Sequence, residues 1–335
     1  MTNLVNTPQN KQFDRNLGLD LLKVLAVFLI TNSHFKTLYE DVNPALATGG
    51  VPGDALFFFA SGFALTLGNS AKSSYIGFVK NKLRRLLPTF IVWNIMANIF
   101  ALKEIGWEDF LLVPEYWFIQ CIFIMYLLIF PFIHMGKRTF LYLMSGSVMI
   151  LLLVMAIFPY PDRSVFNDIT LRYFCFLTPF IFGLYCGINN ERIKENSGWK
   201  DGLWGILLFC SYFVVVSFGK CKENWMYYTE IFALVPLNLF MYYLYRFFNI
   251  GAIGKKIKGN QWLYFCVRFL SLLTLQIYVV QFYLITDRFN QYFPLNILIV
   301  TSIIFVFAYI LNVFTKLFEQ TLSKEAWDLR KAFSI

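Results

Sequence analysis

The sequence predicts an all-α fold: a polytopic bundle of about ten transmembrane helices with both termini in the cytoplasm. Of its 335 residues, 58% are hydrophobic and only 15% are charged, whereas soluble domains average about 45–50% apolar and about 25% charged residues. The apolar residues form blocks of roughly 17–25, long enough to span a hydrocarbon core about 30 Å thick. Lysine and arginine are distributed unevenly between alternate loops, as is typical of membrane topology.

The apolar blocks divide the chain into spans separated by short polar loops. The expected spans are 18–36, 52–69, 86–103, 112–133, 139–158, 169–188, 202–219, 225–247, 262–285 and 292–315. Residues 1–17 then form a cytoplasmic tail, 18–315 the transmembrane domain and 316–335 a second cytoplasmic tail. The first span lacks a cleavage-like A-x-A pattern, so we expect a signal anchor that is not removed.

The net charge of +9 follows from topology and does not indicate nucleic acid binding. With the N-terminus inside, 20 of the 29 lysines and arginines lie in inner tails and loops, and six lie in outer loops. This skew obeys the positive-inside rule. The six cysteines have no paired spacing, so we expect neither a disulfide framework nor a metal site.

The first span carries two ionisable residues, Lys23 and His34. Eleven residues of helix rise about 16 Å and complete about three turns, so both side chains lie on one face. Lys23 alone is consistent with a lysine that extends to lipid phosphates, and His34 with a hydrogen-bonded core histidine. Ionisable groups within spans usually face a cavity or a partner. The shared face favours a stripe that lines an inward-opening channel, with a titratable base at its top.

Five stretches in order give the chain its resemblance to a known family. They are "KVLAVFLITNSH" (23–34), "ALFFFASGFAL" (55–65), "VKNKLRRLLP" (79–88), "YWFIQCIFIMYLLIFP" (116–131) and "LTLQIYVVQ" (273–281). The first has a basic residue, ten intervening residues and a histidine; the second contains F-F-x-x-S-G-F. The chain thereby resembles acyltransferase family 3, integral membrane enzymes that move acetyl or other acyl groups from cytoplasmic acyl-coenzyme A (acyl-CoA) to extracytoplasmic glycans.

The sequence departs from the family pattern at three places. Lys23 stands where most members have arginine, which keeps the charge but loses the bidentate fork. Gln281 stands where many have histidine, and the acid that often precedes the F-F pair falls on Ala55, with Asp54 one place away. The sequence also ends without the extracytoplasmic domain of some relatives, so we expect the membrane part to handle the acceptor.

The resemblance and the predicted depths suggest a donor site at the cytoplasmic side. The candidates for acyl-CoA binding are Lys23, Arg84, Arg85 and Arg268, because charge-assisted bonds from cations to phosphate are strong. The alternative for Arg84 and Arg85 is that they are positive-inside anchors. No metal is expected.

Ser61 is expected about 15 Å below the outer surface, at a depth where it meets His34. Ser61 is a candidate nucleophile or oxyanion donor. Asn32 is a further candidate donor to the oxyanion. The alternative is packing, since small residues let helices approach closely.

Nearer the outer face lie further candidates for binding the acceptor or its oxyanion. They are Tyr116, Trp117, Arg172, Glu230 and Gln281. Aromatic rings suit the apolar faces of sugars, although Tyr116 and Trp117 also fit an aromatic belt. Glu230 is a candidate to orient His34.

The predicted reaction is direct O-acetyl (or other acyl) transfer, in which His34 acts as general base on a sugar hydroxyl. An acyl-enzyme on Ser61 or His34 is one alternative. A transporter or flippase of lipid-linked saccharides is another, although no repeat of the kind found in transporters is evident; a structural or sensory protein is a third. The expected partners are acyl-CoA, a surface polysaccharide or lipid-linked glycan, and membrane lipids, in a bacterial inner membrane.

Overall fold

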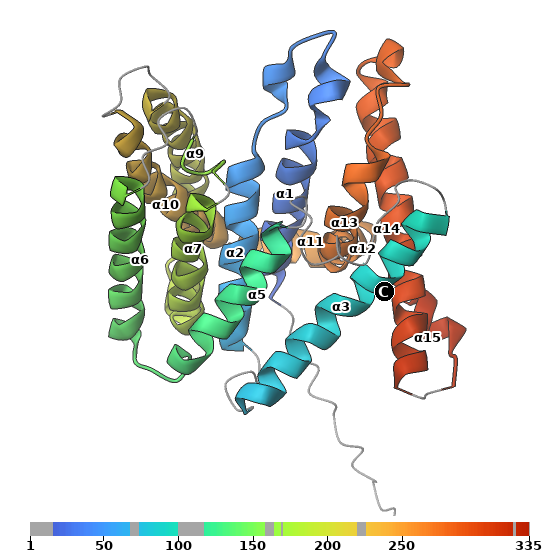
Figure 1. Ribbon diagram of the computed structural model, residues 1–335, viewed down its shortest axis with the longest axis horizontal. Helices are drawn as coiled ribbons and strands as arrows, with labels where there is room; N and C mark the ends of the chain where they lie inside the picture. Colours follow the sequence, from blue (N-terminus) through green and yellow to red (C-terminus); the bar gives the residue numbers. More distant parts are fainter. Residues whose placement is uncertain are drawn as a thin grey trace, which may run out of the picture.

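The computed structural model describes residues 16–67, 74–99, 117–157, 164–168, 170–219, 226–323 and 326–334. Within these ranges the chain forms helices and loops and no β-strand, which confirms the all-α class (Figure 1). The α-helices are α1 (Leu17–Ser33), α2 (Gly50–Leu67), α3 (Tyr75–Ile99), α5 (Trp117–Ile129), α6 (Lys137–Ile157), α7 (Leu171–Ile188), α8 (Asn190–Glu195), α9 (Lys200–Gly219), α10 (Leu234–Phe248), α11 (Gly251–Gly259), α12 (Gln261–Leu272), α13 (Thr274–Leu284), α14 (Leu295–Leu322) and α15 (Leu329–Phe333). The 3₁₀ helices are η1 (Phe35–Tyr39), η2 (Pro44–Leu46), η5 (Phe130–Phe132), η6 (Met226–Ala233) and η7 (Asn290–Tyr292).

Helices overlap all ten predicted spans, but the count of ten is not confirmed. By length and apolar composition, six segments of the described chain qualify as membrane spans, or seven if α12 and α13, bent by 71°, form one broken span. The α1 and α5 helices have only 17 and 13 residues, and α3 carries four cations in its first half. The number of spans therefore stays a prediction. The cytoplasmic location of both termini stays a prediction.

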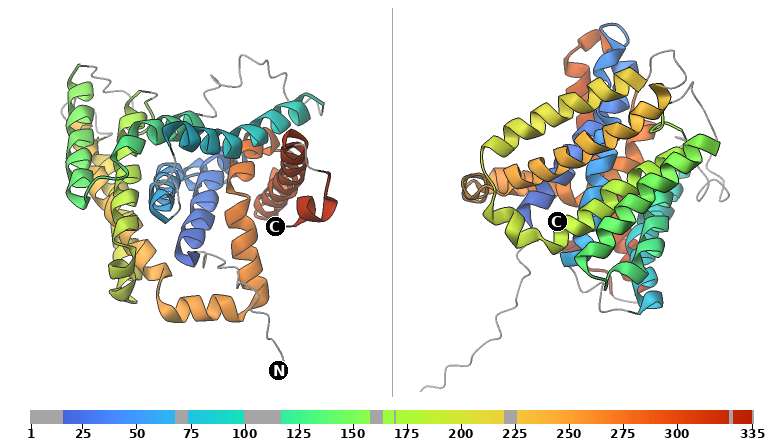
Figure 2. Two further views of the ribbon diagram at one scale, coloured as in Figure 1. Left: turned by 90° about the horizontal axis from the view of Figure 1, so that it is seen from below. Right: turned by 90° about the vertical axis from the view of Figure 1, so that its left-hand side faces the viewer.

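The α1 and α2 helices lie at the centre of the molecule. Seen from below, α3 lies along one side of this pair, and the connection from α10 through α12 lies on the opposite side (Figure 2). The α1 helix contacts α2, α10, α12 and α13, and α2 also packs on α7. A residue on α1 or α2 is therefore placed to face the interior of the bundle.

Glycines set the close approach of α2 and α7. A Cβ atom on Gly62 would lie 2.0 Å from the carbonyl oxygen of Phe180, and one on Gly183 would lie 2.1 Å from that of Phe59. Neither position has room for a side chain, because the two backbones are in contact. Close contact of this kind drives helix association in membranes.

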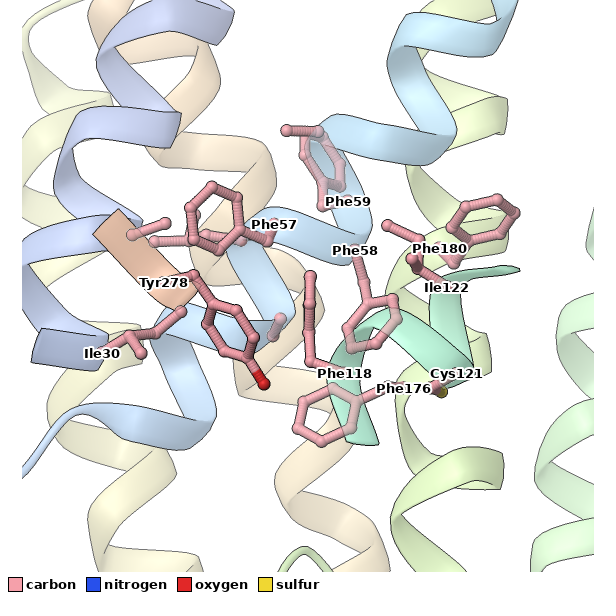
Figure 3. Close-up of a cluster of buried hydrophobic side chains, with 14 of the residues drawn as sticks. Ile30, Phe57, Phe58, Phe59, Phe118, Cys121, Ile122, Phe176, Phe180 and Tyr278 are labelled. Atoms are coloured by element: carbon pink, nitrogen blue, oxygen red, sulfur yellow. The ribbon is translucent and has the colours of Figure 1, made fainter. Parts of the chain in front are cut away.

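Aromatic side chains fill the space where α2, α5 and α7 meet (Figure 3). The ring of Phe58 lies 4.6 Å from that of Phe118 and stacks at 5.0 Å on that of Phe176, between centroids. Offset and edge contacts at such distances contribute beyond the area they bury. This cluster fixes α5, and with it Trp117, against the central pair.

Two close contacts fix the antiparallel register of α1 and α2. Gly50 lies against Ser33, and Gly53 lies against the backbone of Ala26 and Ile30. The end of α1 that carries His34 is thus level with the beginning of α2. Residues near the end of α2 are level with the first turns of α1.

Candidate active site

A large cavity opens at the N-terminal end of α1. It has a volume of about 980 Å³, near the upper end of the range for small-molecule sites. Four cations line it together with two acids: Lys23, Arg85, Lys194, Lys258, Asp20 and Glu191. We call it the mouth cavity. Its excess of cations suits an anionic ligand.

A second cavity of about 500 Å³ continues from the first into the bundle. The two share Lys23, Ala64, Arg85 and Leu272 among their lining residues. This inner cavity ends against aromatic side chains of α2, α5 and α13: Phe57, Phe118 and Tyr278. Together the cavities form a pocket with a cationic entrance and an apolar end.

One face of α3 supplies the cations that flank the inner cavity. Lys82, Arg85 and Thr89 line it, at the spacing that brings side chains to one helix face. The Lys82 ammonium lies 4.3 Å from the ring centroid of Tyr126 across the cavity. Sequence analysis missed Lys82, although its spacing from Arg85 was visible.

Arg84 and Arg268 are not brought to this pocket, contrary to the sequence-based prediction. Arg84 lies on the opposite face of α3 from Lys82 and Arg85, in an apolar groove with Leu87 and Ile91. Arg268 is exposed on α12. Both positions suit cations that extend to lipid headgroups.

Ser61 lies far from His34, so the expected meeting of the two does not occur. Ser61 lines the inner cavity together with Lys23, and its hydroxyl bonds to the Tyr126 phenol. His34 is instead level with Gly50, since Ser33 packs there. The eleven residues between Gly50 and Ser61 correspond to about 16 Å along the helix.

His34 ends α1 and lies against α13. Its ring is half-buried and contacts that of Phe282 edge-to-face, with 4.6 Å between centroids. Phe282 in turn lies 5.5 Å from the ring of Tyr278, which lines the inner cavity. His34 itself lines neither the mouth cavity nor the inner cavity. Two rings on one face of α13 thus connect the end of the pocket with the imidazole.

Gln281 lies on the same face of α13 and is fully buried. Its Oε1 atom accepts a hydrogen bond of 2.8 Å from the Thr31 hydroxyl, one turn before His34. Its Nε2 atom has no hydrogen-bond partner among the residues that the structure describes. An unsatisfied buried donor is costly, so the Gln281 amide nitrogen is available to bond to a ligand.

Asn32 has no donor left for an oxyanion. Its amide nitrogen donates to the carbonyl oxygens of Leu46 and Thr48, at 2.8 and 3.0 Å, and its oxygen accepts from the Tyr39 hydroxyl. These bonds tie the loop after α1 to the end of the helix. Asn32 thus positions the backbone that carries His34.

Glu230 does not orient His34. Its carboxylate accepts bonds from the Ser164 hydroxyl and the Val165 amide, at 2.9 and 2.7 Å, and its side chain packs on Gly219. It belongs to the packing of η6 against α9 and the segment before α7.

Trp117 and Arg172 form a polar and aromatic surface on α5 and α7. The Arg172 guanidinium lies 4.1 Å from the Trp117 ring centroid, and its Nε atom has no hydrogen-bond partner within the described part of the chain. Asp54 interacts electrostatically with Arg172, so a carboxylate is present although it is displaced from the family position. Tyr116 lies outside the described residues.

These features define the class of protein. It is a helical membrane protein whose interior holds a pocket with a cationic entrance, and α13, which lines this pocket, also contacts a histidine and carries an unsatisfied amide donor. The sequence matches the family model of acyltransferase family 3, described as an acyltransferase domain, over residues 16–313, nearly the whole chain. The chain belongs to this family and is a membrane acyltransferase. No curated protein and no solved structure matches it.

Proposed function

We propose that this protein transfers an acetyl or other acyl group from cytoplasmic acyl-CoA to a hydroxyl group of an extracytoplasmic or lipid-linked polysaccharide. The observation that carries the proposal is the pocket itself. Its entrance is lined by Lys23 and Arg85, and its end, at Tyr278, lies on the helix that contacts His34.

The donor enters through the mouth cavity. The diphosphate and 3′-phosphate of coenzyme A bind where the two cavities meet, to Lys23 and Arg85, with Lys82 of the inner cavity nearby. Arg85 contributes a guanidinium that matches phosphate geometry. The mouth cavity has room for the adenosine portion, and the thioester end extends into the inner cavity.

The thioester then has to pass from Tyr278 to His34. Tyr278, Gln281 and Phe282 follow one another on one face of α13. The proposal requires the Tyr278 and Phe282 rings to turn aside when the donor is bound, because they lie between the end of the pocket and the imidazole.

The chemistry is general-base catalysis by neutral His34. The imidazole takes the proton of the acceptor hydroxyl while that oxygen bonds to the thioester carbon. Gln281 Nε2 donates to the resulting oxyanion. The carbon–sulfur bond then breaks, the imidazolium returns the proton to the thiolate, and free coenzyme A leaves.

The acceptor sugar binds at the surface formed by Trp117 and Arg172. An indole face suits the apolar face of a pyranose, and the guanidinium of Arg172 supplies donors for its hydroxyl groups. We place the protein in the inner membrane of a bacterium, with the acceptor side facing outward.

The break between α12 and α13 favours a second candidate, a transporter of a lipid-linked saccharide. Broken helices are typical of transporter sites. A transporter does not consume acyl-CoA.

The test is the release of free coenzyme A by purified protein in lipid nanodiscs, supplied with acetyl-CoA and lipid-linked glycan from a strain that lacks the gene. We expect thiol release that depends on the glycan, together with O-acetyl groups on the product. Two results contradict the proposal: glycan-dependent release of coenzyme A without acylated glycan, and no release of coenzyme A when both substrates are supplied. Loss of O-acetyl groups from surface glycans in the deletion strain is the matching result in cells.

A further inference from the structure

The inner cavity contains polar groups that the proposed reaction does not use. Gln276 and Thr315 line it and are 7% and 4% exposed. The Oε1 atom of Gln276 and the hydroxyl of Thr315 have no hydrogen-bond partner among the described residues. A buried polar atom without a partner costs about 1–3 kcal/mol. Two such atoms in one cavity point to a ligand that satisfies them.

The beginning of α13 faces the same cavity. Ser271, Leu272, Thr274, Leu275 and Gln276 line it from both sides of the break. Within the described chain, no side chain caps the N-terminus of α13, and the first N–H groups of an α-helix have no partner within the helix. The break thus presents backbone donors where a continuous helix would present none.

The combination of donors and acceptors identifies the ligand chemistry. A phosphate has only acceptor oxygens at its surface, so it satisfies the N–H groups of α13 but not the carbonyl oxygen of Gln276. A secondary amide has both an N–H and a C=O group, so it can bond to the Gln276 carbonyl oxygen and to the N–H groups of α13. The coenzyme A arm carries two such amides between its phosphates and its sulfur.

We propose that the inner cavity binds the pantetheine arm of the donor, with Gln276 Oε1 accepting from an amide N–H. The backbone at the start of α13 and the hydroxyl of Thr315 donate to the amide carbonyls. This rests on the proposed function, because it assigns a site for the middle of the same donor. It also gives the α12–α13 break a role: irregular backbone within a membrane protein is tolerated where it lines a cavity.

The two side chains allow near-isosteric tests, Gln276→Leu and Thr315→Val. Thr315→Val removes only a hydroxyl that has no partner among the described residues, so for this variant we expect unchanged or slightly higher thermal stability. A structural role predicts lower stability instead. The control for binding is Thr321→Val on the same helix, whose hydroxyl donates to the Leu317 carbonyl and accepts from the Trp327 indole outside the cavity.

Binding of three probes to protein in nanodiscs separates the parts of the donor: coenzyme A, S-acetyl-pantetheine and adenosine 3′,5′-bisphosphate. We expect each cavity variant to weaken binding of coenzyme A and S-acetyl-pantetheine by about 3- to 10-fold and to leave the bisphosphate unchanged. Arg85→Gln gives the opposite pattern, with weaker binding of coenzyme A and bisphosphate and unchanged S-acetyl-pantetheine.

Two results overturn the inference while the proposed function stands. In one, wild-type protein binds coenzyme A but both cavity variants bind all probes normally. In the other, the cavity variants weaken binding of the bisphosphate as much as binding of S-acetyl-pantetheine, which would mean that the inner cavity binds phosphate. If wild-type protein binds neither coenzyme A nor S-acetyl-pantetheine, the proposed function itself fails.

Discussion

The Thr31 hydroxyl donates a 2.8 Å hydrogen bond to Gln281 Oε1, joining α1 to α13 one turn before His34. This bond fixes the orientation of the Gln281 amide. The Nε2 group has no hydrogen-bond partner among the described residues, and the proposed reaction uses it as the oxyanion donor. This buried pair thus ties α1 to α13 close in sequence to His34, the proposed base.

Loss of this pair is expected to reduce turnover without affecting donor binding. Thr31→Val removes the bond and lets the amide rotate, so we expect kcat to fall by about 10-fold or more, as for weakened oxyanion stabilisation. The KM for acyl-CoA stays near the wild-type value. Thr31→Ser restores the hydroxyl and most of kcat. Equal loss in both variants contradicts a positioning role for the hydroxyl.

Arg85 and Arg84 are adjacent and provide a matched comparison. Arg85→Gln removes a cation from the pocket and is expected to raise the KM for acyl-CoA by about 10-fold or more, since bonds to charged groups contribute about 1.5–3 kcal/mol. Arg84→Gln leaves this KM unchanged, because Arg84 lies in the groove on the other face of α3.

Salt provides an independent check on this comparison. Steady-state kinetics at two ionic strengths should show a KM that rises with salt in wild type and rises less in Arg85→Gln. If Arg84→Gln and Arg85→Gln change the KM for acyl-CoA equally, the assignment of the two residues to different faces of α3 is contradicted.

Gly62 is expected to be intolerant of any side chain. Gly62→Ala places a Cβ atom against the Phe180 carbonyl, and overpacking of this kind typically costs about 1–3 kcal/mol. We expect a lower unfolding temperature in detergent, followed by tryptophan fluorescence. Gly146→Ala on α6 is the control, because nothing lies within 4 Å of the added atom. A stable Gly62→Ala protein contradicts the close α2–α7 contact.

Substitution of Trp117 is expected to weaken binding of the acceptor glycan and to leave binding of the donor acyl-CoA unchanged. Trp117→Ala removes the indole under the Arg172 guanidinium and should raise the KM for the glycan several-fold, while Trp117→Phe retains part of the aromatic face. The KM for acyl-CoA should stay unchanged in both. Initial rates, measured while the concentration of one substrate is varied at a time, show which of the two KM values changes.

Hydropathy and residue periodicity predict much of this fold. The apolar blocks locate the main helices, although α3 begins eleven residues before its predicted span and α14 ends seven residues after its own. The spacing of Lys82, Arg85 and Thr89 was sufficient to separate one face of α3 from the face of Arg84. That spacing was present in the sequence, so the assignment of Arg84 to the pocket was avoidable.

Other features depend on tertiary contacts that leave no local signal. The separation of Ser61 from His34 follows from Gly53 packing on Ile30, which fixes a register that hydropathy does not contain. The break at Leu273 has neither proline nor glycine. The bonds of Glu230 to Ser164 and Val165 join segments about 65 residues apart, so no local pattern reveals them.

The central claim is that His34 is the general base, and its most direct test measures transfer and donor binding in the same preparations. We expect His34→Ala and His34→Gln in nanodiscs to bind coenzyme A with wild-type affinity. Glycan-dependent release of coenzyme A should fall by about 100-fold or more, the usual contribution of a positioned base. Wild-type rates of acyl transfer in a folded His34→Ala protein would contradict the account.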